Sequence, residues 1–328
     1  GRSFWVLDDL DLIRQATPAA LNGIQFFTPE PAILGNWYSS MNAAEPKGTD
    51  VLQGVNPTNG VVFYYHLPEG ISEKDISLEI RDANNHLIRR FVGIKDPTYK
   101  AYEGAPSPAP LLGVNNGLNR FVWDMKHPSL PGIPEAYIET SYSGHRALPG
   151  VYKAILRIGE VQKQVAVRLE SNPLEALDEK ALIEWDTFMT AGENTYREMA
   201  EMVNTLYSLQ LDLKDLLEND EISRNTALKE AITEVLESTI SFDNDMIQRL
   251  SKAYDDVENY PNKFTASYLY VLNQTASSLP KLNMGSVSRM AVLNKEWALL
   301  KVRGENLKNE KVPQLNKLLW NAGIGAIN

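Results

Sequence analysis

The sequence predicts a mixed α+β chain in which an Ig-like β-sandwich is followed by an antiparallel helical bundle. Two observations predict this fold class. Residues 57–171 contain short segments rich in β-branched and aromatic residues with turn residues between them, which favours an Ig-like sandwich over βαβ units. Residues 172–328 instead carry apolar residues every three or four positions, as amphipathic helices do. We interpret residues 1–56 as an extended connector that precedes both domains.

The expected strands are short and are separated by recognisable turns. Alternating polar and apolar residues, joined by the turn residues Asp82-Ala83-Asn84-Asn85, predict a hairpin over 76–92. Other expected strands lie at 61–67, 119–124, 150–158 and 161–169. Two loops rich in Pro, Gly and Ala separate them, at 95–117 and 128–149. Loops of this length are functional, packed or mobile.

The helical part begins with a long apolar seam. Its positions alternate between spacings of three and four residues, and nine of the eleven are apolar: Leu182, Trp185, Met189, Gly192, Tyr196, Met199, Val203, Leu206, Gln210, Leu213 and Leu217. Such a seam needs a partner along its length. Further amphipathic helices are expected over 228–250, over 264–279 and from Ser286, which can cap the last one. Pro313 should bend or restart that helix. We expect the seam to pack within the chain, with a dimer interface or a partner groove as the alternatives.

The connector is unusual in its aromatic content. Residues 4–9 alternate as a short strand would, and several prolines follow between 16 and 56. The connector contains more aromatic residues than a free linker carries, namely Phe26, Phe27, Trp37 and Tyr38. We therefore expect these side chains to pack against a neighbouring domain.

Composition excludes several classes of function. The net charge of −10 argues against nucleic-acid binding, which needs a basic face. No apolar run is long enough to span a membrane, and the absence of cysteine excludes disulfides and thiolate metal sites. The four histidines have no helical metal-ligand spacing, and no Walker, Rossmann or nucleophile-elbow motif occurs. We therefore predict no metal and no cofactor.

Several residues are candidates for a functional site, and most of them also have a structural interpretation. Trp123-Asp124 could stack on a sugar, but we expect Trp123 in the core and Asp124 capping a turn. Glu135 and Glu139 could form a glycosidase pair, although loop carboxylates are usually solvated. Asp243-Asn244-Asp245 resembles part of a calcium loop, but helical periodicity runs through it. The candidates for ligand binding are the loop aromatics Tyr99, Tyr102, Tyr137 and Tyr142.

The opening phrase Gly1-Arg2-Ser3-Phe4-Trp5-Val6-Leu7-Asp8-Asp9 resembles the end of the last blade in secreted bacterial β-propeller proteins with BNR/sortilin-like repeats, often labelled glycosyl-hydrolase-like. Segments at 56–61, 78–83, 117–124 and 149–152 resemble that family's Ig-like domain, and 315–323 its C-terminal helices. The resemblance implies a C-terminal region, without its N-terminal propeller, located outside the cell or in the periplasm. Any catalytic carboxylates would then lie in the propeller.

Three functions remain open. The first is a non-catalytic accessory region that supports or orients the propeller and binds protein or glycan partners. The second is a carbohydrate-binding module that uses the four loop tyrosines. The third is an enzyme in its own right, which would need a pocket of converging acids between sandwich and bundle.

Overall fold

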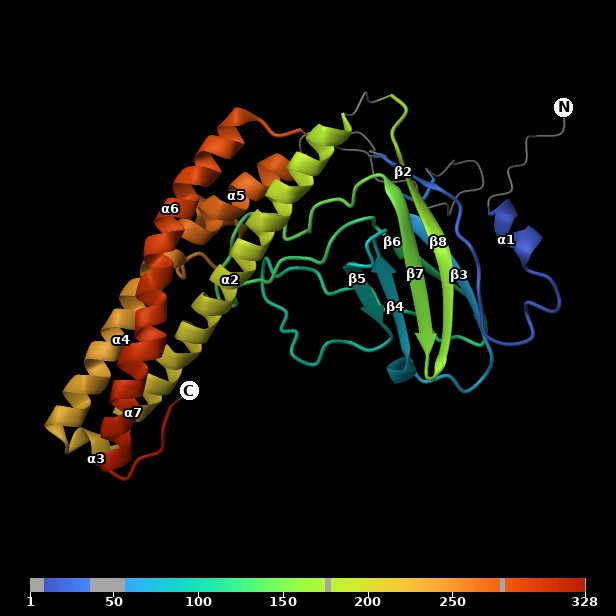
Figure 1. The fold of residues 1–328 in the computed structure, drawn as a ribbon. Helices are drawn as coiled ribbons and strands as arrows, with labels where there is room; N and C mark the ends of the chain where they lie inside the picture. Colours follow the sequence, from blue (N-terminus) through green and yellow to red (C-terminus); the bar gives the residue numbers. More distant parts are fainter. Residues whose placement is uncertain (1–8, 36–56, 175–177, 278–280, 328) are drawn as a thin grey trace. The chain divides into compact units, whose positions relative to one another are not determined.

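The computed structural model describes residues 9–35, 57–174, 178–277 and 281–327, and it is a mixed α+β structure with two sheets and a set of helices (Figure 1). The chain divides into two compact units, and neither is one continuous stretch. The first, the strand unit, takes the described parts of 1–99, 108–128 and 144–183. The second, the helical unit, takes 100–107, 129–143 and the described parts of 184–328.

The strand unit contains both sheets. The three-stranded sheet has the order β1 (Gln25–Phe26), β3 (Val61–Leu67), β6 (Gly117–Trp123) and is antiparallel. The five-stranded sheet has the order β2 (Ala32–Leu34), β8 (Val161–Ser171), β7 (Gly150–Ile158), β4 (Ile76–Arg81), β5 (Leu87–Val92). Only β2 runs parallel to its neighbour among these described strands. A short 3-10 turn, η1 (Glu73–Asp75), leads into β4.

The predicted strands and the predicted hairpin over 76–92 are confirmed. Strand β3 buries every second side chain, as its alternating pattern requires, whereas β4 buries five of its six residues. One core takes side chains from both sheets. Its largest fully buried members include Trp123, Tyr65, Phe63, Phe91, Leu67, Ile76, Leu78 and Ile80.

The connector packs on the strand unit in part as predicted. Phe26 and Phe27 are buried, at 4% and 2% exposed, and β1 pairs with β3. Trp37 and Tyr38 lie outside the described residues, as do residues 4–8 of the expected opening strand. Asp9, the last residue of that expected strand, instead precedes a short helix, α1 (Leu10–Gln15).

Gly60 precedes β3 in a conformation that favours glycine. Its φ is +150°, and an added Cβ would lie 2.8 Å from Val122 Cγ1 and overlap the carbonyl oxygen of Trp123. We expect Gly60→Ala to lower the free energy of unfolding by about 2–4 kcal/mol, from backbone strain and overpacking together. Gly159 has φ +55° and open space around it, so Gly159→Ala is the matched control. This variant should lower the free energy of unfolding by about 1 kcal/mol, from backbone strain alone. Urea denaturation of both variants measures the difference, and equal losses would contradict the role of the close contact.

In chain order the elements of the helical unit are α2 (Glu179–Leu217), which begins in the strand unit, α3 (Asp220–Ser223), α4 (Thr226–Met246), the 3-10 turn η2 (Tyr254–Glu258), α5 (Phe264–Ser277), α6 (Met284–Asn306), the π-helical segment η3 (Leu307–Lys311) and α7 (Val312–Asn321). The longer helices of the helical unit are α2, α4, α5, α6 and α7 (Figure 1).

The predicted seam of α2 packs within the chain. Ten of its eleven positions are buried, and Leu217 is half-buried. Gly192 and Gln210 are the two seam positions that are not apolar, and contacts with other helices explain both residues. An added Cβ at Gly192 would lie 2.7 Å from Leu272, and Gln210 donates from Nε2 to the carbonyl oxygen of Thr239 at 3.1 Å. The seam is therefore an internal packing face in the described structure.

Two helix boundaries differ from the prediction. Helix α4 ends at Met246, so Leu250 lies outside it and is 63% exposed. Helix α6 is capped by Asn283 instead of Ser286, because the Asn283 Oδ1 atom accepts a hydrogen bond from the Ser286 amide at 2.7 Å. No restart occurs at Pro313, because the chain stays helical from α6 through η3 into α7. The proline lies in the first turn of α7, directly after the π-helical segment.

The described helices include none with the length and apolar character needed to cross a membrane. The coarse prediction of a mixed α+β chain is confirmed. The two sheets and the helices do not by themselves establish the finer assignment, an Ig-like sandwich followed by an antiparallel bundle, and the five-stranded sheet alone is not a sandwich.

Candidate functional site

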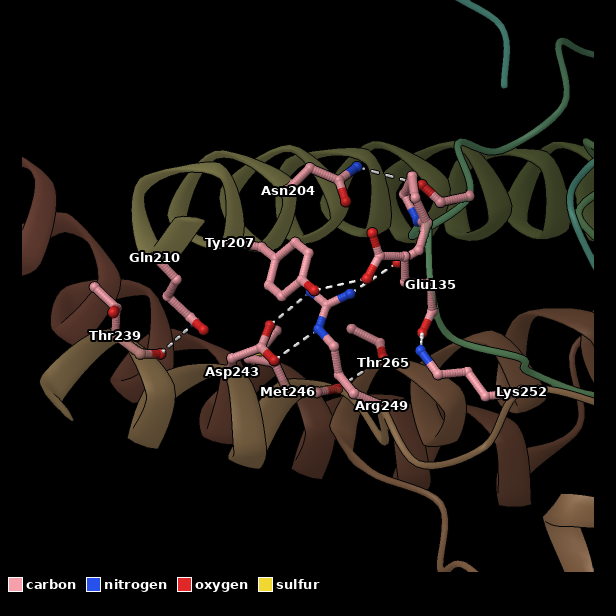
Figure 2. Close-up of polar contacts among 12 residues, drawn as sticks. Glu135, Asn204, Tyr207, Gln210, Thr239, Asp243, Met246, Arg249, Lys252 and Thr265 are labelled. Atoms are coloured by element: carbon pink, nitrogen blue, oxygen red, sulfur yellow. Dashed lines mark hydrogen bonds and ion pairs between the residues drawn. The ribbon is translucent and has the colours of Figure 1, made fainter. Parts of the chain in front are cut away.

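The loop at 129–143 belongs to the helical unit, where side chains hold its backbone at several points. Arg197 Nη1 donates to the carbonyl oxygen of Ser129 at 2.9 Å. Asn204 Nδ2 donates to the carbonyl oxygen of Gly132 at 3.3 Å. Arg249 Nη1 donates to the carbonyl oxygen of Pro134 at 2.7 Å (Figure 2). Three loop carbonyl groups thus accept hydrogen bonds from donors on α2 and on the segment after α4.

Arg249 lies at the centre of these contacts. Its Nε and Nη2 atoms donate to the two carboxylate oxygens of Asp243 at 2.8 and 2.7 Å, and its guanidinium carbon lies 3.5 Å from the centre of the Tyr207 ring. Asp243 is buried, at 5% exposed. The end of α4 at Met246 makes this geometry possible, because the chain leaves the helix and Arg249 reaches back to the last turn. A bidentate pair of this kind is a strong, directional contact.

Glu135 extends the cluster to the loop. Its Oε2 atom accepts a hydrogen bond from the Tyr207 hydroxyl at 2.7 Å, and its carbonyl oxygen accepts one from Lys252 Nζ at 2.5 Å (Figure 2). Burial raises the pKa of Tyr207, and the Glu135 hydrogen bond raises it further. We call Glu135, Tyr207, Asp243, Arg249 and Lys252 the Arg249 cluster.

Glu135 also has an uncommon backbone conformation, with φ +61°. A non-glycine residue in this region is held there by its surroundings, here by the bonds to Tyr207 and Lys252. Both Glu135 and Glu139, its predicted partner in a glycosidase pair, are exposed. The Glu135 carboxylate therefore has a structural role in the described geometry, since it fixes the loop on α2.

The four tyrosine candidates have different surroundings. Tyr99 is 39% exposed, Tyr102 and Tyr137 are half-buried, and Tyr142 is buried at 6% exposed. Burial raises the pKa of Tyr142, and the neighbouring Tyr102 raises it further. Tyr196 of α2 is also fully buried beside them, and its pKa is raised well above the ordinary value for the same reason. A sugar ring has no access to the face of Tyr142.

These buried phenols predict a loss of stability at alkaline pH. Their folded pKa values lie above the ordinary 10.0, so the stabilisation is complete below about pH 10 and decreases as the pH rises further. We expect the free energy of unfolding to fall between about pH 10 and 11.5 in urea titrations. Tyr142→Phe should reduce this slope, because it removes one of the buried phenols. An unchanged slope in Tyr142→Phe would count against the burial argument.

The remaining sequence candidates have structural roles. Trp123 is fully buried, and its Nε1 atom donates to the carbonyl oxygen of Lys126 at 3.0 Å. Asp124 accepts a hydrogen bond from the Lys126 amide at 3.2 Å, as predicted for a turn cap. His66 and His86 lie near strand ends, within hydrogen-bond distance of Gly23 and Asp82 respectively. The rings of His127 and His145 stack with centroids 4.0 Å apart.

The acidic run Asp243-Asn244-Asp245 lies within α4 and does not form a loop. Asp243 pairs with Arg249, and Asp245 pairs with Arg303 at 2.5 Å. The later Asp256 accepts hydrogen bonds from the amides of Lys252 and Ala253, so it stabilises the turn before η2. These carboxylates neutralise cations and cap turns in the helical unit.

A scan against protein-family models found no match, and a search of curated proteins found none either. Sequence reasoning missed Arg249, because its six-residue separation from Asp243 matches no helical pairing rule. The apolar seam of α2 did not indicate this contact either, because Tyr207, the residue on which Arg249 stacks, is not one of the seam positions.

Proposed function

We propose that this chain is a non-catalytic accessory region of a larger secreted propeller protein, which it supports and orients. The observation that carries the proposal is the Arg249 cluster. Through Glu135 and Arg249 it bonds the loop at 129–143 to the helices. The Glu135 carboxylate thus fixes the loop, and Tyr142 is buried in the unit. The propeller, the relation to glycoside hydrolases and the location outside the cell rest on the resemblance of the opening segment.

The test compares the parent protein with a version that ends before this chain. We expect the shortened protein to unfold at a lower temperature, while each folded molecule keeps its turnover of glycoside substrates. The isolated chain should hydrolyse none of those substrates. Hydrolysis by the isolated chain that is lost in Glu135→Gln would contradict the proposal.

The finer fold assignment supports the same function. We infer that the strand unit is an Ig-like sandwich, because its two sheets share one core, and that the helices form an antiparallel bundle. Domains of both kinds commonly act as spacers and supports. An experimental structure in which the two sheets do not face each other would contradict this assignment.

A second candidate function, carbohydrate binding by loop aromatics, is favoured by the surroundings of Tyr137. Burial raises the pKa of this tyrosine, and the charges of Glu139 and Glu103 raise it further, together with the neighbouring Tyr254. An aromatic ring beside carboxylates can stack on a sugar and accept hydrogen bonds from its hydroxyl groups. Loss of glycan-array binding in Tyr137→Ala would support this candidate, and binding that Tyr137→Ala leaves unchanged would contradict it.

A further inference from the structure

A hollow of about 480 Å³ lies between α5 and the start of α6, away from the residues of the Arg249 cluster. Its volume falls within the range of small-ligand sites, about 300–1,000 Å³. The lining residues all belong to the helical unit. They are Asn262, Ala266, Ser267, Tyr270, Val271, Gln274, Asn283, Gly285, Ser286 and Arg289.

The floor and the rim of this hollow differ in chemistry. Ala266 and Val271 are buried and give a small apolar floor. The rim carries flat polar side chains, and its Tyr270 ring is 64% exposed. Arg289 and Asn262 are exposed as well.

Three side chains of the lining are not used by the fold. Within the described part of the chain, Tyr270, Arg289 and Asn262 make no side-chain hydrogen bond or ion pair. By contrast, Arg197 and Arg249 bind loop carbonyl groups, and Arg303 pairs with Asp245. Asn283 is also engaged, because it caps α6 and donates to Ser286 Oγ at 3.0 Å. The groups left for a ligand therefore include a phenol ring, an amide and a guanidinium group.

The chemistry of these three groups indicates the ligand class. The Tyr270 ring offers an apolar face to the C–H face of a sugar, and amides pair with vicinal hydroxyl groups. The Arg289 guanidinium group suits a carboxylate, which it can bind through two parallel hydrogen bonds. The lining holds one cation and no carboxylate, although the whole chain has a net charge of −10. An anionic ligand therefore meets a locally favourable charge.

We propose that the hollow between α5 and α6 binds a saccharide that carries a carboxylate, a uronic or sialic acid unit. The carboxylate lies against Arg289, the sugar face lies on Tyr270, and Asn262 bonds the hydroxyl groups. This site goes beyond the accessory role proposed above and does not depend on it. It is also distinct from the loop aromatics around Tyr137.

The test uses the full chain and isothermal titration with trigalacturonate, triguluronate, a hyaluronan tetrasaccharide and sialyllactose at millimolar concentrations. Lactose and maltotriose are the neutral controls. We expect at least one acidic glycan to bind, and the neutral sugars to bind more weakly. Tyr270→Ala and Arg289→Gln should each weaken that binding by at least about tenfold. Both residues are exposed, so circular dichroism should show an unchanged fold.

Tyr254→Ala, at a tyrosine that is 61% exposed outside the hollow, is the matched control and should bind as the natural sequence does. The proposal is overturned if none of the four acidic glycans binds. It is equally overturned if Tyr270→Ala binds unchanged while Tyr137→Ala does not, because the loop aromatics would then hold the sugar.

Discussion

Asp243→Ala is expected to lower the free energy of unfolding of the helical unit by about 3–5 kcal/mol. The variant leaves the Arg249 guanidinium group, whose side chain is 15% exposed, without the carboxylate that binds two of its nitrogen atoms. An uncompensated charge in that position is more costly than the pair itself is stabilising. Urea denaturation monitored by far-UV circular dichroism measures the loss.

The same helix offers a matched control two residues away. Asp245 pairs with Arg303 at 2.5 Å, but the two side chains are 53% and 38% exposed. Asp245→Ala should therefore cost only about 0–1 kcal/mol. The double variant Asp243→Ala/Arg249→Met should recover part of the loss, because it removes the unpaired cation. Equal losses in Asp243→Ala and Asp245→Ala would show that burial does not determine the effect.

Local periodicity explains why most helices and strands could be predicted. The spacings of three and four residues place the α2 seam on one side of a helix, and ten of its eleven positions are buried. The β4–β5 hairpin likewise follows from alternation and from Asp82-Ala83-Asn84-Asn85, of which Asn85 has φ +67°. These features depend on neighbours in sequence, so the sequence alone was sufficient.

The boundaries and the candidate site depend on contacts between distant residues, which periodicity does not encode. Asn283 and Ser286 are both good capping residues, and the choice between them depends on where α6 begins. Glu135 and Tyr207 are 72 positions apart, and Arg249 lies 115 positions from Pro134. No local pattern could indicate that these residues meet. The loop could be predicted as packed or functional, but its partners could not.

Replacing residues 129–143 of the full chain by a Gly/Ser linker of equal length is expected to unfold the helical unit or to lower its melting temperature strongly. The loop contributes buried side chains to that unit, at Leu130, Ile133, Ala136, Ile138 and Tyr142. Each large apolar side chain is worth about 1.5–3 kcal/mol when buried, so their sum approaches the whole stability of a domain, about 5–15 kcal/mol. The linker also leaves Arg197, Asn204 and Arg249 without the loop carbonyl groups that they bind.

Point variants within the loop test whether its buried side chains stabilise the helical unit, because they leave the length of the loop unchanged. Ile133 is fully buried, so Ile133→Ala should cost about 2–5 kcal/mol, whereas Glu139→Ala at an exposed position should stay within about 0.5 kcal/mol. A synthetic peptide of residues 129–143 should raise the melting temperature of the linker variant, and a scrambled peptide should not. If the linker variant melts at the temperature of the natural chain, the helices are stable by themselves and the loop only rests on them.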